Sequence, residues 1–239
     1  EHLWDMHSRS DSAGRVTMVA ATSDDSASVR VRAMYQALAL CEAWREAGKH
    51  VVLFVDSVTR LAMALREVGL AAGEAPTVRS YTPNVFAALP GVVERCGAIK
   101  GSGAITAIFT VLSETDDVDD PIVETMKSIL DGHIVLSRKL AEKGHFPAID
   151  IAASVSRVSD RVLDQQTRAA TRAVRRSFAL YQESRDMIES GIYHNGSNPE
   201  LDRAIRQQPR IVDFVQQDKP ASPDLAAMDR QLVQLAEER

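Results

Sequence analysis

A carboxylate closes the most apolar stretch of this 239-residue sequence. The run His50–Asp56 (HVVLFVD) is typical of a buried strand, and Asp56 is its last residue. Ligands of doubly wound sheets bind beyond the carboxyl ends of the strands. Mg²⁺ needs only one or two carboxylates there, because it keeps several of its waters. A magnesium site and a helix N-cap are both compatible with Asp56.

Two arginines lie close to the ends of predicted strands. Arg60 follows Asp56 by four residues, where it would pair with a local acid or reach a phosphate. Arg157, in Ser154–Val158 (SVSRV), follows the last predicted strand. A guanidinium that reaches a neighbouring subunit's phosphate accelerates phosphoryl transfer by about 10³–10⁵. On the pattern alone, however, a structural ion pair is the better interpretation for both arginines.

Other polar groups favour structural roles. The acidic segment Ser113–Asp120 is typical of a solvated loop, with a metal site as the alternative. His133 and His145 have no partners at ligand spacing. Five arginines fall partly on one helical face and indicate a solvated or subunit-contacting surface. They are Arg161, Arg168, Arg172, Arg175 and Arg176.

The composition excludes several classes of protein. The formal net charge of −5 argues against wrapping nucleic acid through bulk electrostatics. No apolar stretch approaches the roughly 20 residues that a membrane-spanning helix needs. Cys41 and Cys96 lie in apolar-periodic stretches, which indicates buried thiols in a reducing compartment. The sequence holds no GxxxxGK[ST], GxSxG, HExxH, CxxC or GxGxxG motif.

Strands and helices alternate from residue 15 to about residue 155, which predicts a parallel sheet with helices on both faces. The predicted strands are Arg15–Ala21, His50–Asp56, Ala104–Leu112, Ile134–Leu136 and Ala148–Ala153. The predicted helices are Ser26–Ala47, Val58–Ala71, Asn84–Cys96 with Asn84 as the N-cap, and Ile122–Leu130. After Val158 only helical patterns remain. We therefore expect an α/β domain over residues 1–158 and an all-α C-terminal domain over residues 159–239.

A series of motifs resembles one family, the ATPases of flagellar and virulence type III export, which are similar to subunits of rotary ATP synthases. The resemblance is close over residues 15–158 and implies a RecA-like sheet. A helical segment, Tyr181–Ile205, resembles the C-terminal domain of that family. The motifs are VAATSD (Val19–Asp24), FVDSVTR (Phe54–Arg60), MALREVGL (Met63–Leu70), Gly73–Pro90, FTVLSETDD (Phe109–Asp117), Ile129–Asp150 and SVSRV (Ser154–Val158).

The resemblance implies an ATP site with Mg²⁺. Asp56 matches the strand-end aspartate associated with Mg²⁺, and Arg60 matches the active-site arginine that follows it. Phe146 matches an aromatic residue that packs on the adenine, a position at which the family more often has Tyr. Arg157 matches the arginine finger offered to the neighbouring subunit. The segment Gly73–Pro90 matches a loop that faces the central channel.

The family's phosphate-binding loop, its Gly-Glu-Arg segment with the catalytic Glu, and its β-barrel domain do not occur in this sequence. We therefore expect a fragment with an incomplete RecA-like core that does not hydrolyse ATP by itself. The intact protein would act as a homohexamer that energises protein export, flagellar export being slightly favoured. A non-catalytic docking or assembly module is the alternative. A ring-shaped RNA translocase is a further alternative, which the acidic charge disfavours.

The resemblance also implies partners and a location. The partners would be a stator-like regulator, a coiled-coil stalk protein, export substrates and their chaperones, with no nucleic acid. The protein would be cytoplasmic, at the base of the export apparatus, and would touch the membrane only peripherally.

Overall fold

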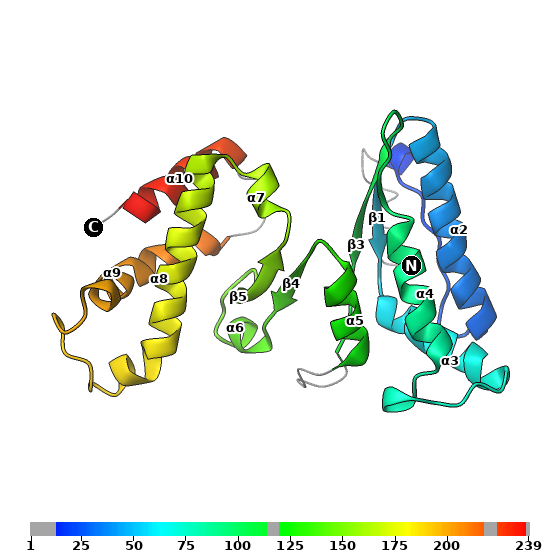
Figure 1. Ribbon diagram of the computed structural model, residues 1–239, viewed down its shortest axis with the longest axis horizontal. Helices are drawn as coiled ribbons and strands as arrows, with labels where there is room; N and C mark the ends of the chain where they lie inside the picture. The colour runs from blue at the N-terminus through cyan, green and yellow to red at the C-terminus, as the bar shows by residue number, and fades with distance from the viewer. Residues whose placement is uncertain (1–12, 114–119, 218–223, 238–239) are drawn as a thin grey trace. The chain divides into compact units, whose positions relative to one another are not determined.

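The computed structural model describes residues 13–113, 120–217 and 224–237 (Figure 1). It forms two compact units, unit 1 up to Leu130 and unit 2 from Asp131 onward, each with its own hydrophobic core. This division precedes the predicted boundary at residue 158, because the last two strands pair with each other and pack with the helices that follow. A functional boundary at 158 stays a prediction.

Unit 1 alternates helices and strands as the sequence predicts. The long helix α2 is capped by Ser26, whose side chain accepts a hydrogen bond from the Val29 amide, and Gly48 follows its end with a φ of +79°. The elements are η1 (Ala13–Arg15), α2 (Ala27–Glu46), β1 (His50–Val55), α3 (Val58–Ala71), η2 (Val78–Ser80), α4 (Pro83–Glu94), β2 (Gly97–Ala98), β3 (Ala104–Phe109) and α5 (Pro121–Ile129).

A three-stranded sheet in the order β1-β3-β2 forms the centre of unit 1. Strands β1 and β3 are parallel, with Val51 opposite Ile105, whereas β2 is antiparallel to β3. Val51, Leu53 and Ile105 are buried on the face that the helices cover. Within unit 1 the opposite face is more open, since Val52 is 54% and Phe54 71% exposed there.

The predicted strand Arg15–Ala21 does not form. The segment begins with the 3-10 turn η1 and continues without secondary structure to residue 21. Its apolar side chains Val16 and Met18 are exposed by 48% and 41%. An apolar, β-branched run becomes a strand only when a neighbouring strand satisfies its backbone groups, and no described strand pairs with it.

Unit 2 joins a β-hairpin to a helical bundle. Its elements are β4 (Gly132–Leu136), α6 (Arg138–Glu142), β5 (Ile149–Ser156), α7 (Ser159–Val162), α8 (Gln165–Glu189), α9 (Pro199–Val215) and α10 (Leu225–Glu237). Strands β4 and β5 are antiparallel, so they do not extend a parallel sheet as predicted. Gly132 allows the two strands to approach, because a Cβ atom there would lie 2.6 Å from the Val155 carbonyl oxygen.

The three long helices of unit 2 share a small core. Val174 of α8, Ile211 of α9 and Leu235 of α10 are its buried apolar members. Gln207 is buried beside them, accepting from the Ser177 hydroxyl at 2.7 Å and donating to the Leu235 carbonyl at 3.0 Å. None of the described helices has the length and apolar character required to span a membrane.

Candidate active site

Asp56 lies at the carboxyl end of β1, where the backbone turns into α3. Its Oδ1 atom accepts a hydrogen bond from the Thr110 hydroxyl at 2.8 Å, and Thr110 directly follows β3. The Thr110 amide in turn donates to the Val55 carbonyl at 3.0 Å. The two parallel strands therefore hold the carboxylate at their shared edge, with its side chain exposed.

Asp56 is not the N-cap of the helix that follows. That position belongs to Ser57, whose side chain accepts from the Arg60 amide at 3.4 Å. The helix therefore does not use the Asp56 carboxylate as its cap, which removes the N-cap interpretation for this residue. The Asp56–Ser57 peptide bond is cis.

Arg60 lies in the first turn of α3, so it shares the edge of β1 with Asp56. Its side chain is exposed and forms no ion pair with the described residues. The buried Thr59 fixes this turn, because its hydroxyl donates to the Leu112 carbonyl at 3.0 Å and accepts from the Leu112 amide at 2.8 Å. None of the described acidic residues forms the ion pair with Arg60 that the sequence analysis offered as one of its two roles.

Thr59 and Thr110 are positioning residues that the sequence analysis missed. Each bonds across two chain segments about 53 residues apart. Such pairing depends on the register of β1 and β3, which a single sequence does not reveal. The only signal was a hydroxyl residue close to the end of each strand.

The donor set at Asp56 fits Mg²⁺ held through water. Within the part of the chain that the structure describes, Thr110 engages Oδ1 and no hydrogen bond is formed by Oδ2, and the side chain is open to solvent. Among the described residues, no group of three His, Cys, Asp or Glu side chains forms a cage for a metal ion. A single carboxylate is what Mg²⁺ uses when waters and phosphate oxygens complete its octahedron.

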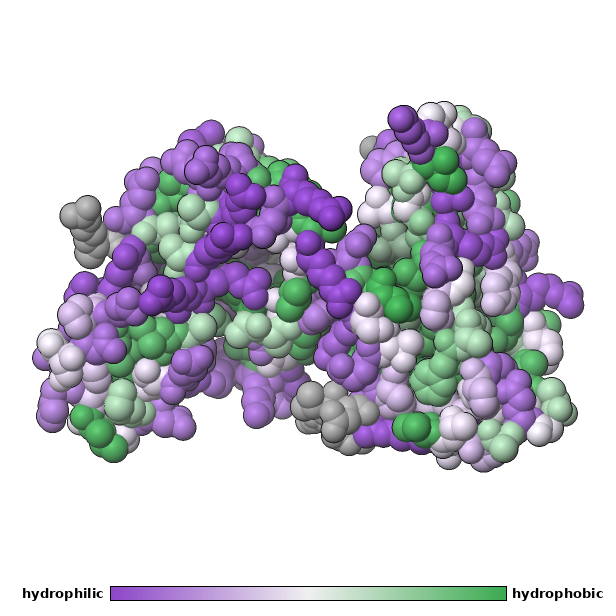
Figure 2. All heavy atoms as spheres, in the orientation of Figure 1, coloured by the Kyte–Doolittle hydropathy of each residue, from purple (hydrophilic) through white to green (hydrophobic). Residues whose placement is uncertain are grey.

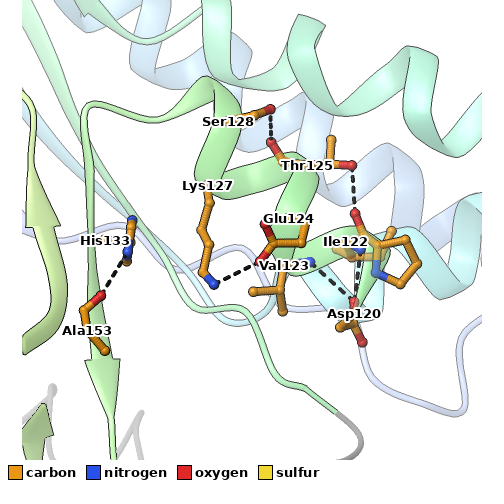
Figure 3. Close-up of polar contacts among 10 residues, drawn as sticks. Asp120, Ile122, Val123, Glu124, Thr125, Lys127, Ser128, His133 and Ala153 are labelled. Carbon is orange, nitrogen blue, oxygen red and sulfur yellow. Dashed lines mark hydrogen bonds and ion pairs between the residues drawn. The ribbon is translucent and has the colours of Figure 1, made fainter. Parts of the chain in front are cut away.

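The acidic segment ends in a helix cap. Asp120 is buried, and its Oδ1 accepts from the amides of Ile122 at 2.9 Å and Val123 at 3.2 Å, at the start of α5 (Figure 3). Its carboxylate therefore stabilises the first turn of the helix. The other acidic residues of the segment lie outside the described residues; they are Glu114, Asp116, Asp117 and Asp119.

Phe146 lies in the loop between α6 and β5, and its side chain is 54% exposed. The residues after α9 hold this loop. The Gln217 amide donates to the Phe146 carbonyl at 3.0 Å, and Gln216 Nε2 lies 3.2 Å from His145 Nδ1. The sequence analysis missed Gln216 and Gln217, because they are about 70 residues from the loop in the chain.

Arg157 lies at the opposite end of β5 from Phe146. Its amide donates to the Asp131 carbonyl at 2.8 Å, and its side chain is exposed. An eight-residue strand such as β5 spans roughly 25 Å. The structure therefore separates Phe146 from Arg157 within one chain. Asp56 and Arg60 belong to unit 1 and these two residues to unit 2.

The two cysteines are structural. Burial raises the pKa of the Cys41 thiol, and Glu42 raises it further; burial also raises the pKa of the Cys96 thiol. Both thiols are therefore protonated near neutral pH, and neither is an activated nucleophile.

The fold and the strand-end residues define a class of protein, an α/β nucleotide-binding domain followed by a helical bundle. Residues 1–156 match the model of the ATP synthase alpha/beta family, nucleotide-binding domain. Residues 163–234 match the T3SS EscN ATPase C-terminal domain. The chain belongs to the ATP synthase alpha/beta family, and it carries a C-terminal domain of the EscN type.

The curated relatives come from export systems. The chain is 49% identical over 203 residues to the flagellum-specific ATP synthase of Treponema pallidum, which covers 85% of this chain and 45% of the relative. It is 47% identical over 205 residues to the SPI-2 type 3 secretion system ATPase of Salmonella typhimurium, covering 86% and 47%. The predicted resemblance to flagellar and type III export ATPases is confirmed. The chain spans about half the length of these relatives.

Solved structures confirm the predicted fold class. The assembled ATPase EscN of an enteropathogenic E. coli type III secretion system superposes with a TM-score of 0.87 at 42% identity, over 90% of this chain and 52% of that chain. EscN in complex with its central stalk EscO superposes with a TM-score of 0.82 at 40% identity, over 90% and 51%.

Proposed function

We propose that this chain forms part of an ATPase that assembles as a homohexamer and energises flagellar or virulence type III protein export. The observation that carries the proposal is the exposed pair Asp56 and Arg60 at the carboxyl end of β1. It lies in a chain whose first 156 residues match a nucleotide-binding domain. Flagellar export remains slightly favoured over virulence secretion.

Asp56 would hold a magnesium ion through its water shell, and a bound ion would supply positive charge that offsets the charge of the ATP phosphates. Thr110 holds the carboxylate in place for this role, since its hydroxyl bonds one of the two oxygens. Arg60, whose charge the described residues leave unpaired, would face the phosphate end of the same site.

Phe146 and Arg157 would serve two different nucleotides. Phe146 would stack its exposed ring on the adenine bound by its own subunit. Arg157 would reach the phosphates bound by the neighbouring subunit and stabilise the charge that develops during transfer. Their placement at opposite ends of β5 supports this division, because a single nucleotide would not contact both residues of the same subunit.

We infer the partners of this protein from those of its relatives. The assembled EscN and its complex with the stalk EscO support self-assembly around a coiled-coil stalk. A stator-like regulator, export substrates and their chaperones would complete the set, at a cytoplasmic position at the base of the export apparatus.

Mixed assemblies of the intact protein test the proposal. Asp56→Asn and Arg157→Ala should each reduce kcat for Mg-dependent ATP hydrolysis by about 10²-fold or more. Mixing the two inactive variants should restore part of the turnover. At some interfaces an intact Asp56 from one subunit then meets an intact Arg157 from the next.

The alternatives predict different results. An arginine that acts within its own subunit would give no recovery on mixing. Full turnover by both single variants would contradict the assigned sites. The 239-residue chain alone should bind partners without hydrolysing ATP, and Mg-dependent turnover by this chain would show that it needs no phosphate-binding loop.

A further inference from the structure

Three arginines of α8 hold the segment that carries Arg157. We call Ser154–Asp160, the end of β5 and the start of α7, the finger strap. Arg168, Arg172 and Arg175 follow one another at i, i+4 and i+7, so they share one face of the helix. Figure 2 shows hydrophilic residues gathered over α8.

Each of the three arginines bonds the finger strap near one of its ends. Arg175 Nη2 donates to the Ser154 carbonyl at 3.0 Å, three residues before Arg157. Arg168 Nη1 donates to the Asp160 carbonyl at 2.9 Å, three residues after it. Arg172 Nη2 lies 3.0 and 2.9 Å from the two carboxylate oxygens of Asp160. The helix therefore brackets Arg157 from both sides.

The strap is also fixed to β4, because Ser156 pairs with Gly132, Val155 pairs with His133, and the Val135 amide donates to the Ser154 hydroxyl at 2.9 Å. The Arg157 amide donates to the Asp131 carbonyl at 2.8 Å, directly before the first residue of β4. The backbone of Arg157 is thus held between a hairpin on one side and a long helix on the other, while its side chain is exposed. A displacement of α8 along or about its axis would pull the strap at both ends against this anchor.

We propose that Arg168, Arg172 and Arg175 are positioning residues that couple the placement of α8 to that of Arg157. The proposal rests on the proposed function of Arg157 as a group acting on a neighbouring nucleotide. Arg172 and Asp160 are 69% and 59% exposed in their side chains, so their bond contributes little to folding and is released at low cost. Such contacts between α8 and the finger strap can break and form again between the states of an ATPase cycle.

The test uses a matched control on the same helix. Arg176 bonds Glu200 of α9 at 3.0 Å, and these side chains are 75% and 67% exposed, close to the values for Arg172 and Asp160. The pair does not touch the finger strap. Arg176→Gln therefore removes one exposed ion pair of α8 without altering the strap.

The first readout is hydrogen exchange of the 239-residue chain. In the double variant Arg168→Gln/Arg172→Gln, we expect severalfold faster exchange of the Arg157, Arg161 and Leu163 amides. These amides donate within the hairpin and α7. The control Arg176→Gln should leave them unchanged. Equal exchange in the double variant and the control would overturn the proposal.

The second readout is ATP turnover of the intact protein. Because the finger acts on charge that develops in the transition state, the double variant should lose about tenfold in kcat with an unchanged KM. The charge swap Asp160→Arg/Arg172→Asp should recover most of the kcat that Arg172→Asp alone loses. Equal losses in the swap and the single variant would contradict the positioning role.

A parallel Arg157→Ala variant separates the two possible failures. If it abolishes turnover while the double variant behaves like Arg176→Gln, only the positioning proposal is overturned. If it keeps full turnover, the proposed function of Arg157 is wrong, and the positioning proposal falls with it.

Discussion

The two candidate active-site segments are held by different kinds of contact. Asp56 sits at the edge of a sheet whose buried side lies in a large core, and a hydrogen bond between two parallel strands fixes it. The strap around Arg157 pairs with β4 through Val155, Ser156 and the Arg157 amide, and exposed arginines of α8 bond both of its ends. Buried ladders and cores are costly to rearrange, whereas exposed ion pairs are screened and contribute little. The first arrangement suits Asp56 as a metal ligand with a fixed position. The second suits an arginine whose position changes when the contacts from α8 change.

The largest effect should come from the hydrophobic core of unit 1. Leu89 of α4 is 1% exposed, so Leu89→Ala should destabilise unit 1 by about 2–5 kcal/mol through lost burial and the cavity left behind. Urea unfolding followed by hydrogen exchange, resolved by peptide, measures this in each unit. Amides of β1 should exchange faster, and those of α8 should not.

A control separates burial from a general effect of truncation. Leu70 of α3 is 46% exposed, and Leu70→Ala should cost far less than Leu89→Ala. Equal acceleration in both units after Leu89→Ala would show that they unfold together, and the contrast between the two segments would then lose its basis.

A smaller effect should come from the hairpin that anchors Arg157. A Cβ atom on Gly132 would lie 2.6 Å from the Val155 carbonyl oxygen, which belongs to the backbone and has little room to move. Gly132→Ala should therefore destabilise β4 and β5 by roughly 1–3 kcal/mol. Exchange of the Arg157 amide should rise in this variant. Gly144→Ala, where a Cβ meets no atom within 4 Å but φ is +74°, measures the cost of backbone strain alone. If Gly132→Ala destabilises the chain no more than Gly144→Ala does, the steric explanation is contradicted.

Local signals predicted the helices of unit 1 well. Helix α2 begins and ends within one residue of its prediction, because Ser26 and Gly48 act on adjacent backbone groups. The predicted N-cap at Asn84 is wrong: Thr82 occupies that position, with Pro83 as the first helical residue. Asn84 instead donates from its side chain to the Leu65 carbonyl at 2.8 Å. Pro83 was the stronger signal, because proline favours the first helical position and so places the N-cap at Thr82.

Contacts between residues far apart in the chain could not be predicted from the sequence. Asp56, Arg60, Phe146 and Arg157 were chosen from their resemblance to a family and from the ends of predicted strands, and their roles stay predictions. The bonds from α8 to the finger strap depend on how a helix packs on a hairpin, and the arginine pattern alone indicated only a solvated or subunit-contacting face.

The smallest effect should come from an ion pair of unit 1 that is partly shielded from solvent. Glu42 of α2 receives two bonds from the Arg95 guanidinium, and the side chains are only 25% and 30% exposed. The hydrogen bond from Arg95 lowers the pKa of the Glu42 carboxyl. This pair should resist salt better than Arg172 and Asp160, because solvent screens it less.

Glu42→Gln tests that difference through pH. A lowered folded-state pKa means that the pair stabilises fully above the ordinary carboxyl pKa of about 4.3, and that this contribution disappears as pH falls through the folded value. The wild-type chain should therefore lose stability relative to Glu42→Gln between pH 6 and pH 3, by about 1 kcal/mol or less. Urea midpoints of both chains across this range measure the loss. Parallel curves would mean that folding does not lower the pKa of Glu42.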